Sequence, residues 1–293
     1  MNQIIIKVTQ FVITSALLFL SVFSNAQEKL DNTLLWKISG KGLEKPSYLY
    51  GTMHAVCETN IDEDVLKAFE ETNQLYLEVD MDDPNLQMAM MSGLQMKNGT
   101  TISSFLTEDE VKLVDDFIQN NVGVPLKMVD SFKPSLLTSM YLPKLLDCPM
   151  KAVDMELMNI SKEQNEEIFG LETIQDQLNV FDKIPYDVQV KELLKTVKSG
   201  LAKEKEEIQK MLSIYKSENI EKMLISSKEA ENKMLADYEE DLLLKRNRNW
   251  IPVIEKAAKE NPTFFGVGAA HLAGEEGVIK LLRKQGYKVE PVQ

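Results

Sequence analysis

The order strand, glycine turn, histidine, helix, strand occurs twice in this chain, and this repeat constrains the fold more than any other feature. The first copy spans residues 46–80 and the second spans residues 262–292. In each copy a short apolar run ends at a glycine, Gly51 or Gly268, and a histidine follows three residues later. Strand–helix–strand units form parallel strands joined by right-handed crossovers. We therefore predict an α/β fold, with a parallel or mixed sheet built from two βα repeats that carry GxxH turns.

The sequence between the repeats is mainly helical. A helix opened by Asp154 as its N-terminal cap precedes a short strand at Ile168–Leu171. From about residue 187 to residue 258 the pattern is almost wholly helical and rich in Glu, Lys, Leu and Met. No Gly/Pro-rich linker separates two domains. We expect residues 27–293 to form a single α/β domain with a large helical insert at about 187–258.

Residues 1–26 have the pattern of a cleavable signal peptide. An apolar stretch runs from Phe11 to Phe23, and Ser24 and Ala26 occupy the −3 and −1 positions of a signal peptidase site. The alternative, a membrane anchor, needs about 20 apolar residues, and this run is shorter. We expect cleavage after Ala26, a secreted or periplasmic protein, and no stable membrane span after cleavage.

The net charge limits the possible partners. At −13, it argues against non-specific binding to nucleic acid or to an anionic membrane surface. A peptide or small-molecule substrate remains open, and the sequence leaves the oligomeric state undecided.

The only two histidines of the chain, His54 and His271, follow the two glycine turns. Ligands bind at the carboxyl ends of strands in open parallel sheets, so two neighbouring repeats would place both imidazoles at one crevice. Neutral imidazoles suit a transition metal. Glu78, at the end of the strand after the first helix, is the candidate third ligand, with Asp80 as its rival. The alternative is structural, with both histidines satisfied by backbone groups.

Two cysteines remain in the mature chain, Cys57 and Cys148. In an oxidising compartment they could form a disulfide. Cys57 follows His54 by three residues, so a Cys/His metal site is also open, although the absence of CxxC spacing disfavours structural zinc. The sequence alone does not decide whether the cysteines pair.

Several motifs together resemble the TraB/GumN family. They are "YLYGTMH", "YLEVD", "GLET", "KRNRNW" and "VGAAHLAGEEGVIKLLRKQGYKV", in the family's order over nearly the whole mature chain. This family is related to the Tiki proteases, which depend on manganese or cobalt. It is more distantly similar to the erythromycin esterases and the ChaN-type haem-binding proteins.

The resemblance implies a set of site residues. The paired GxxH histidines correspond to His54 and His271, and the family's strand glutamate corresponds to Glu78. Its arginine–asparagine pair falls on Arg246 and Asn247. The remaining implied residue is Glu172 of the central "GLET". The chain departs from the family at Lys245, where an acidic residue is usual. Structural alternatives are an ion pair of Arg246 with an acid of the Glu-rich helix and a place for Asn247 on the helix surface.

The function implied is that of a secreted metal-dependent hydrolase, Tiki-like, that cleaves a peptide or ester bond. His54 and His271 would hold a divalent transition metal, manganese or cobalt by resemblance. Glu78 would complete the ligand set or act as general base, and Arg246 would stabilise an oxyanion. The alternative is a non-catalytic protein that sequesters a small peptide or a haem-like ligand. Neither the substrate nor the metal can be named from the sequence.

Overall fold

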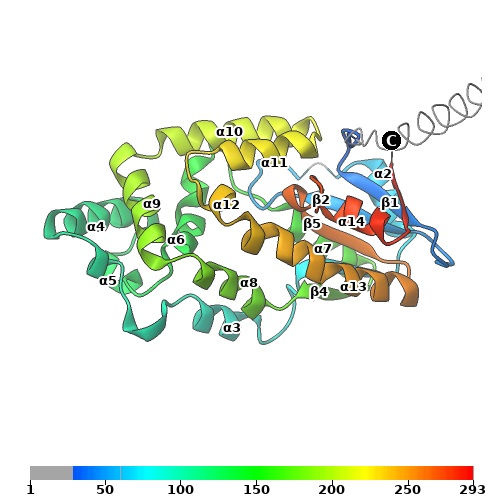
Figure 1. Ribbon diagram of the computed structural model, residues 1–293, viewed down its shortest axis with the longest axis horizontal. Helices are drawn as coiled ribbons and strands as arrows, with labels where there is room; N and C mark the ends of the chain where they lie inside the picture. Colours follow the sequence, from blue (N-terminus) through cyan, green and yellow to red (C-terminus); the bar gives the residue numbers. More distant parts are fainter. Residues whose placement is uncertain (1–28, 60, 293) are drawn as a thin grey trace, which may run out of the picture. The chain divides into compact units, whose positions relative to one another are not determined.

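The computed structural model describes residues 29–59 and 61–292, and the strands in these ranges form one six-stranded sheet (Figure 1). The strands are β1 (Leu35–Ser39), β2 (Ser47–Thr52), β3 (Gln74–Val79), β4 (Glu167–Glu172), β5 (Phe264–Gly268) and β6 (Lys288–Pro291). The order across the sheet is β4-β3-β5-β2-β1-β6. The predicted signal peptide, residues 1–26, lies outside the described residues. The division into signal peptide and mature domain therefore stays a prediction.

The sheet is mixed, as predicted. β2, β5, β3 and β4 are neighbours that run parallel, whereas β1 pairs antiparallel with both β2 and β6. The two repeats meet at the centre, where β2 pairs with β5 and Thr52 lies opposite Gly268. The two GxxH turns therefore follow adjacent strands at the same edge of the sheet.

Helices account for most of the remaining described chain. Before β4 in the chain they are α2 (Glu63–Glu70), α3 (Leu86–Gly93), α4 (Glu108–Val122), α5 (Leu126–Val129), α6 (Pro134–Tyr141) and α7 (Val153–Glu163). After β4 they are α8 (Ile174–Val180), α9 (Tyr186–Ser199), α10 (Ala202–Lys216), α11 (Ile220–Glu229), α12 (Met234–Asp237), α13 (Lys245–Glu260) and α14 (Val278–Lys284). Short 3-10 turns are η2 (Lys97–Gly99), η3 (Ser103–Phe105), η4 (Leu142–Leu145), η5 (Phe181–Lys183) and η7 (Ala269–His271), and η6 (Glu240–Leu244) is a π-helix.

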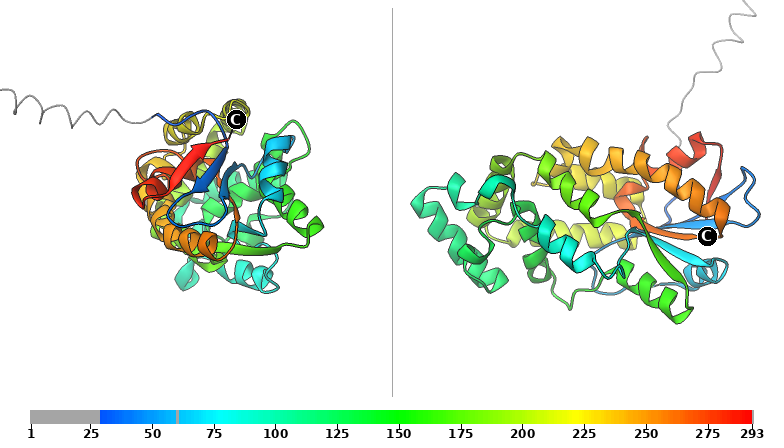
Figure 2. Two further views of the ribbon diagram at one scale, coloured as in Figure 1. Left: turned by 90° about the vertical axis from the view of Figure 1, so that its right-hand side faces the viewer. Right: turned by 90° about the horizontal axis from the view of Figure 1, so that it is seen from below.

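Right-handed crossovers place helices on both faces of the sheet. The connections through α2 and α7 move across the sheet toward β4, and those through α13 and α14 move toward β6, so the two pairs cover opposite faces (Figures 1 and 2). On the first face the Phe69 ring of α2 packs 4.6 Å from Phe264 of β5, centroid to centroid. On the second face α13 contacts α14 and β4. The sheet is thereby buried on both sides, as parallel sheets require.

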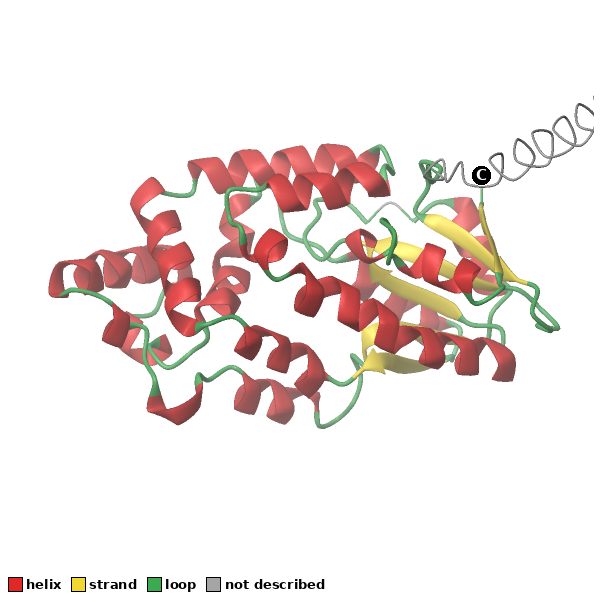
Figure 3. Cartoon of the chain, viewed as in Figure 1, coloured by secondary structure: helices red, strands yellow, loops and turns green. Residues whose placement is uncertain are grey.

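Apart from α7, which packs on β3, β4 and β5, the helices from α3 to α12 extend beyond the carboxyl ends of the strands and have a core of their own (Figure 3). Buried apolar residues of α4, α5, α6 and α9, including Ile118, Leu137 and Leu193, pack together there. Helices α9 to α13 cover the segment in which the sequence predicts a helical insert. The chain between β3 and β4 is also mainly helical, from α3 to α7.

Two further features bear on the environment of the protein. Cys57 and Cys148 form a disulfide, with their Cα atoms 5.6 Å apart. Among residues 29–59 and 61–292, no helix combines the length and the apolar character that crossing a membrane requires.

Candidate functional site

Four parallel strands deliver polar side chains to one edge of the sheet. His54 follows β2, His271 follows β5, Glu78 is the penultimate residue of β3 and Glu172 is the last residue of β4. Helix α13 contributes Arg246 and Asn247 from its first turn. These predicted site residues, far apart in the sequence, therefore all belong to elements that end or begin at this edge of the sheet.

His271 is buried, with 5% of its surface exposed, and both ring nitrogens have partners. Its Nδ1 lies 2.5 Å from Oδ1 of Asn247, and its Nε2 lies 3.2 Å from Nη1 of Arg246. Because the amide oxygen only accepts and the guanidinium only donates, the ring carries its proton on Nδ1. Burial lowers the pKa of His271 to about 3, so the imidazole is neutral at pH 7.

His54 differs from His271 in exposure and in charge. Its side chain is 64% exposed, and Nδ1 lies 2.7 Å from Oδ2 of Asp154. The hydrogen bond to this carboxylate raises the pKa of His54 above its usual range. The charges of Glu78 and Arg246 also act on the pKa of His54. The prediction that Asp154 caps helix α7 is wrong, because Ala152 is the N-cap and Asp154 instead contacts the sheet turn.

Glu78 lies at the centre of the cluster. Its Oε1 accepts from the backbone N–H of Gly268 at 2.9 Å and lies 3.8 Å from Nε2 of His271. Its Oε2 accepts from Arg246 at 2.6 Å and from Gln177 at 3.0 Å. A Cβ on Gly268 would lie 3.1 Å from Oε1, a tight contact with the carboxylate. The backbone thus approaches the carboxylate closely enough to hydrogen-bond it.

Arg246 connects the two strand carboxylates. Its Nη2 donates to Oε1 of Glu172 at 2.5 Å as well as to Glu78, and its Nε donates to Glu172 at 2.9 Å. Nη1 also donates to the carbonyl of Leu242, within the π-helix that precedes α13. The guanidinium lies over the Trp250 ring, 4.9 Å from its centroid. The side chain is therefore held in place on every side, and the proposed surface pair with an acid of the Glu-rich helix is not what forms.

The two carboxyl groups that share Arg246 have pKa values shifted in opposite directions. Burial opposes the ionisation of Glu78, but the charges of His271, Arg246 and His54 outweigh it and lower the pKa to about 2. Since His271 is neutral at pH 7, Arg246 is the buried cation that holds Glu78 ionised there. Burial raises the pKa of Glu172 despite its bonds to Arg246. Two carboxyl groups whose pKa values are driven apart are typical of sites that move protons.

Other predicted residues lie elsewhere. Asp80, the rival of Glu78, accepts from the backbone of Asp82 in the turn after β3 and has no bond to either histidine within residues 29–59 and 61–292. Cys57 is bonded to Cys148, so the alternative Cys/His metal site is wrong. Asn247 is 2% exposed, and its amide donates to the carbonyl of Glu276, so it is not a surface residue.

The histidine and carboxylate side chains of the site are of the types that bind transition metals. Three of them do not, however, converge on one point. Both histidines have Nδ1 bound to an acceptor, which is the usual arrangement when Nε2 ligates a metal. Glu78 adds a carboxylate that is itself hydrogen-bonded by backbone. In the part of the chain that the structure describes, no group of three or more His, Cys, Asp or Glu side chains is arranged to hold a metal ion. A metal at His271 would have to compete with Arg246 for Nε2.

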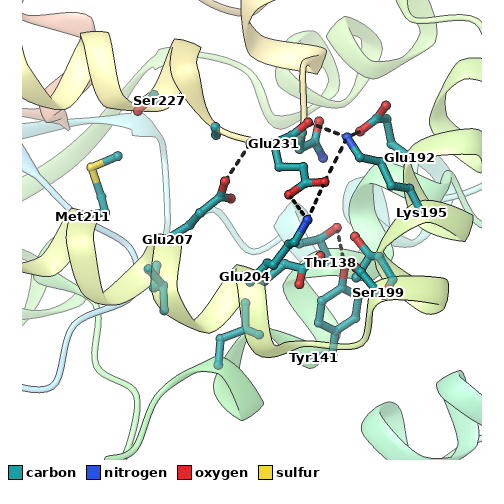
Figure 4. A pocket seen from close by; sticks show the side chains of 16 residues that line it. Thr138, Tyr141, Glu192, Lys195, Ser199, Glu204, Glu207, Met211, Ser227 and Glu231 are labelled. Carbon is teal, nitrogen blue, oxygen red and sulfur yellow. Dashed lines mark hydrogen bonds and ion pairs between the residues drawn. The ribbon is translucent and has the colours of Figure 1, made fainter.

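Two cavities differ in their relation to this cluster. One, of about 330 Å³, is lined by Glu172 and Arg246 together with Lys183 and Lys245, so it opens onto the site. Another, of about 300 Å³, lies among the helices and is shown in Figure 4. Its lysines, Lys195 and Lys203, pair with Glu231, and none of its lining residues comes from the sheet. Of these two, the first cavity is therefore the one that adjoins the site.

Sequence reasoning missed several residues of the cluster. Gln177 and Thr52 touch site carboxylates, and the Trp250 ring packs 4.5 Å from the ring of His271. Trp250 lies one helical turn after Arg246 and Asn247, a spacing that places all three near one face of the helix and could have indicated the contact. Gln177 and Thr52 carry no such signal.

The fold and the cluster define an α/β protein whose polar site is built at the carboxyl ends of parallel strands. The chain belongs to the TraB/PrgY/gumN family, whose sequence model matches residues 34–291. Metalloprotease TIKI2 of Danio rerio is 20% identical over 88% of this chain and 61% of its own length. Metalloprotease TIKI1 of Xenopus tropicalis is 23% identical over 90% of this chain and 62% of its own length. The chain thus spans about three fifths of these relatives, and no match is found among solved structures.

Proposed function

We propose that this protein is an exported metal-dependent hydrolase that cleaves a peptide or ester bond. The observation that carries the proposal is that the two GxxH turns follow adjacent parallel strands, with His271 in contact with Glu78 and Arg246 at their carboxyl ends. The distant metalloprotease relatives support the same class of reaction. The Cys57–Cys148 disulfide supports export, because disulfides persist in oxidising compartments.

Each residue has a part in this proposal. His54, His271 and Glu78 would hold a divalent metal, manganese or cobalt. When bound, such a metal supplies a Lewis acid and lowers the pKa of a coordinated water to about 7. Glu78 is ionised, as a metal ligand or a general base must be. Arg246 would stabilise a developing oxyanion by exchanging one of its present hydrogen bonds for one to substrate, while Glu172 holds the guanidinium in place.

A second candidate is a protein that binds a small peptide or a haem-like ligand without turnover. It is favoured by the ion pairs of Arg246, which already neutralise part of the carboxylate charge without any metal. The same histidines would then bind ligand rather than activate water. The two candidates differ in whether a product forms.

The test is mass spectrometry of a peptide library incubated with manganese- or cobalt-loaded protein. We expect products with the wild type, none after chelation, and none with His54→Ala. Glu78→Gln should lower the rate by about 10²–10⁴-fold if Glu78 is the base, or remove the metal as well if it is a ligand. The control is Glu167→Gln, at the exposed start of β4, which should leave the rate unchanged. Identical product patterns in wild type and His54→Ala would refute hydrolysis at this site.

A further inference from the structure

The contact between His54 and Asp154 has no assigned role. One carboxylate oxygen, Oδ2, lies 2.7 Å from Nδ1 of His54, and the other accepts from the hydroxyl of Thr52 at 2.6 Å. Asp154 is 7% exposed, whereas the imidazole that it binds is mostly exposed. Both oxygens are therefore directed at the turn after β2, and helix α7 is capped by another residue.

The two segments that carry this pair are fastened together on both sides of it. Segment 53–57 contains His54, and segment 148–153 leads directly into Asp154. Their links are the Val153 N–H to the Met53 carbonyl at 3.1 Å, two backbone bonds of 2.9 and 2.8 Å between Val56 and Lys151, and the disulfide of Cys57 with Cys148. The distance from Asp154 to His54 is thus set by the backbone rather than by one flexible side chain.

We propose that Asp154 is a positioning residue for His54, holding the ring proton on Nδ1 so that the Nε2 lone pair is free for a ligand. An ionised carboxylate only accepts hydrogen bonds, so Nδ1 must be the donor. Fixing one nitrogen in this way fixes the tautomer and the orientation of the ring. Thr52 in turn orients the carboxylate.

This assignment also distinguishes the two histidines. His271 is held by the neutral amide of Asn247, and His54 is held by a charged carboxylate. A carboxylate partner raises the basicity of a ligating imidazole more than an amide does. His54 is therefore the stronger donor of the two and also the more exposed.

Imidazole ¹⁵N NMR tests the assignment without any metal, because the chain has only two histidines to resolve. At a pH above the titration of His54, the wild type should show its proton on Nδ1. Asp154→Ala should give a mixture of tautomers at His54, whereas Asp154→Asn, which keeps an acceptor, should restore Nδ1–H. The signals of His271 serve as internal control. The matched variant is Glu156→Ala, which removes another acid from the same helical turn.

Cobalt binding, followed by its absorption spectrum, tests the consequence and is the only arm that rests on the proposed function. Asp154→Ala should weaken Co²⁺ affinity about 10–100-fold, Asp154→Asn less, and Glu156→Ala not at all. An unchanged His54 spectrum in a folded Asp154→Ala protein would overturn the positioning role. If the wild type itself binds no Co²⁺, the proposed metal site fails, and the NMR result still decides the role of Asp154.

Discussion

At the scale of single residues, Arg246 is the side chain on which the buried charges depend. It and its two partners, Glu78 and Glu172, expose only 10–12% of their side chains. Buried ion pairs contribute little net stability compared with apolar packing, but removing one partner leaves an uncompensated buried charge. The cost of losing Arg246 should therefore be large even if its presence stabilises the fold only slightly.

Arg246→Met should lower the free energy of unfolding by about 3–5 kcal/mol, because two buried carboxylates lose their cation. Chemical denaturation measures it. The control is Arg248→Met on the same helix, since Arg248 is 39% exposed and pairs with Glu240 and Glu276 at the surface. Its loss should cost no more than about 1 kcal/mol. Equal losses in the two variants would contradict the buried network.

His271 makes the folded protein sensitive to acid. Its pKa is about 3 in the folded state, below the ordinary value of 6.5, so the unfolded chain binds the proton more tightly. Stability is therefore complete above pH 6.5 and is lost as the pH falls toward 3. His271→Gln should remove this dependence, so its stability relative to wild type should rise by up to about 1.4 kcal/mol for each pH unit below 6.5. Unfolding curves at several pH values check it, and parallel pH profiles of the two proteins would contradict it.

The sequence predicted which residues gather at the site but not how they bind one another. His54, His271, Glu78 and Glu172 follow strand ends, and strand ends of a parallel sheet meet at one edge, so their proximity was foreseeable. Asp154 was wrongly predicted to cap α7, because an aspartate at the start of a helix can either cap that helix or bind side chains of another element. Only the tertiary position of α7 decides between them.

At the scale of elements, the repeat predicted the central pair of strands and not the edges of the sheet. Two similar βα units pack side by side, and β2 and β5 do so. The place of β1 between β2 and β6 depends on antiparallel pairing, for which the repeat carries no signal. The order of strands beyond the repeat is set by which helices cover which face, a property of the complete chain.

Gly170, near the end of β4, allows β4 to pack closely against β3. A Cβ on Gly170 would lie 2.6 Å from the backbone nitrogen of Asp80 and 2.7 Å from the carbonyl oxygen of Glu172. A Cβ on Gly266 would meet only the ends of side chains, Leu157 and Leu77, at 2.8 and 2.9 Å. Backbone atoms cannot move aside as side-chain ends can. Position 170, two residues before Glu172, should therefore tolerate no Cβ.

Gly170→Ala should destabilise the protein by about 3 kcal/mol and Gly266→Ala by about 1 kcal/mol, the two ends of the usual range for overpacking. Both substitutions reduce the entropy of the unfolded chain equally, so their difference isolates the clash. Thermal or chemical unfolding of the two variants gives the comparison. A larger loss for Gly266→Ala would show that the β3–β4 approach is looser than described.

At the scale of the whole molecule, one covalent link joins the sheet turn to the helical part of the chain. The disulfide connects Cys57, just after His54, to Cys148, just before α7, across 91 residues. Neither spacing nor neighbouring motifs could reveal this pairing, because the intervening chain includes a strand and five helices. The link closes a long loop, and closing long loops restricts the unfolded state most.

Replacing both cysteines with serine should therefore lower the free energy of unfolding by about 4–5 kcal/mol, the chain-entropy value for a loop of this length. Three backbone hydrogen bonds between segments 53–57 and 148–153 remain, so the folded variant should keep the His54–Asp154 contact. The expected result is a large loss of stability with an unchanged His54 NMR signal. Added reductant should destabilise the wild type to the level of the variant and leave the variant unaffected. If reductant instead altered the His54 signal while the protein stayed folded, the disulfide rather than the backbone bonds would hold the turn in place.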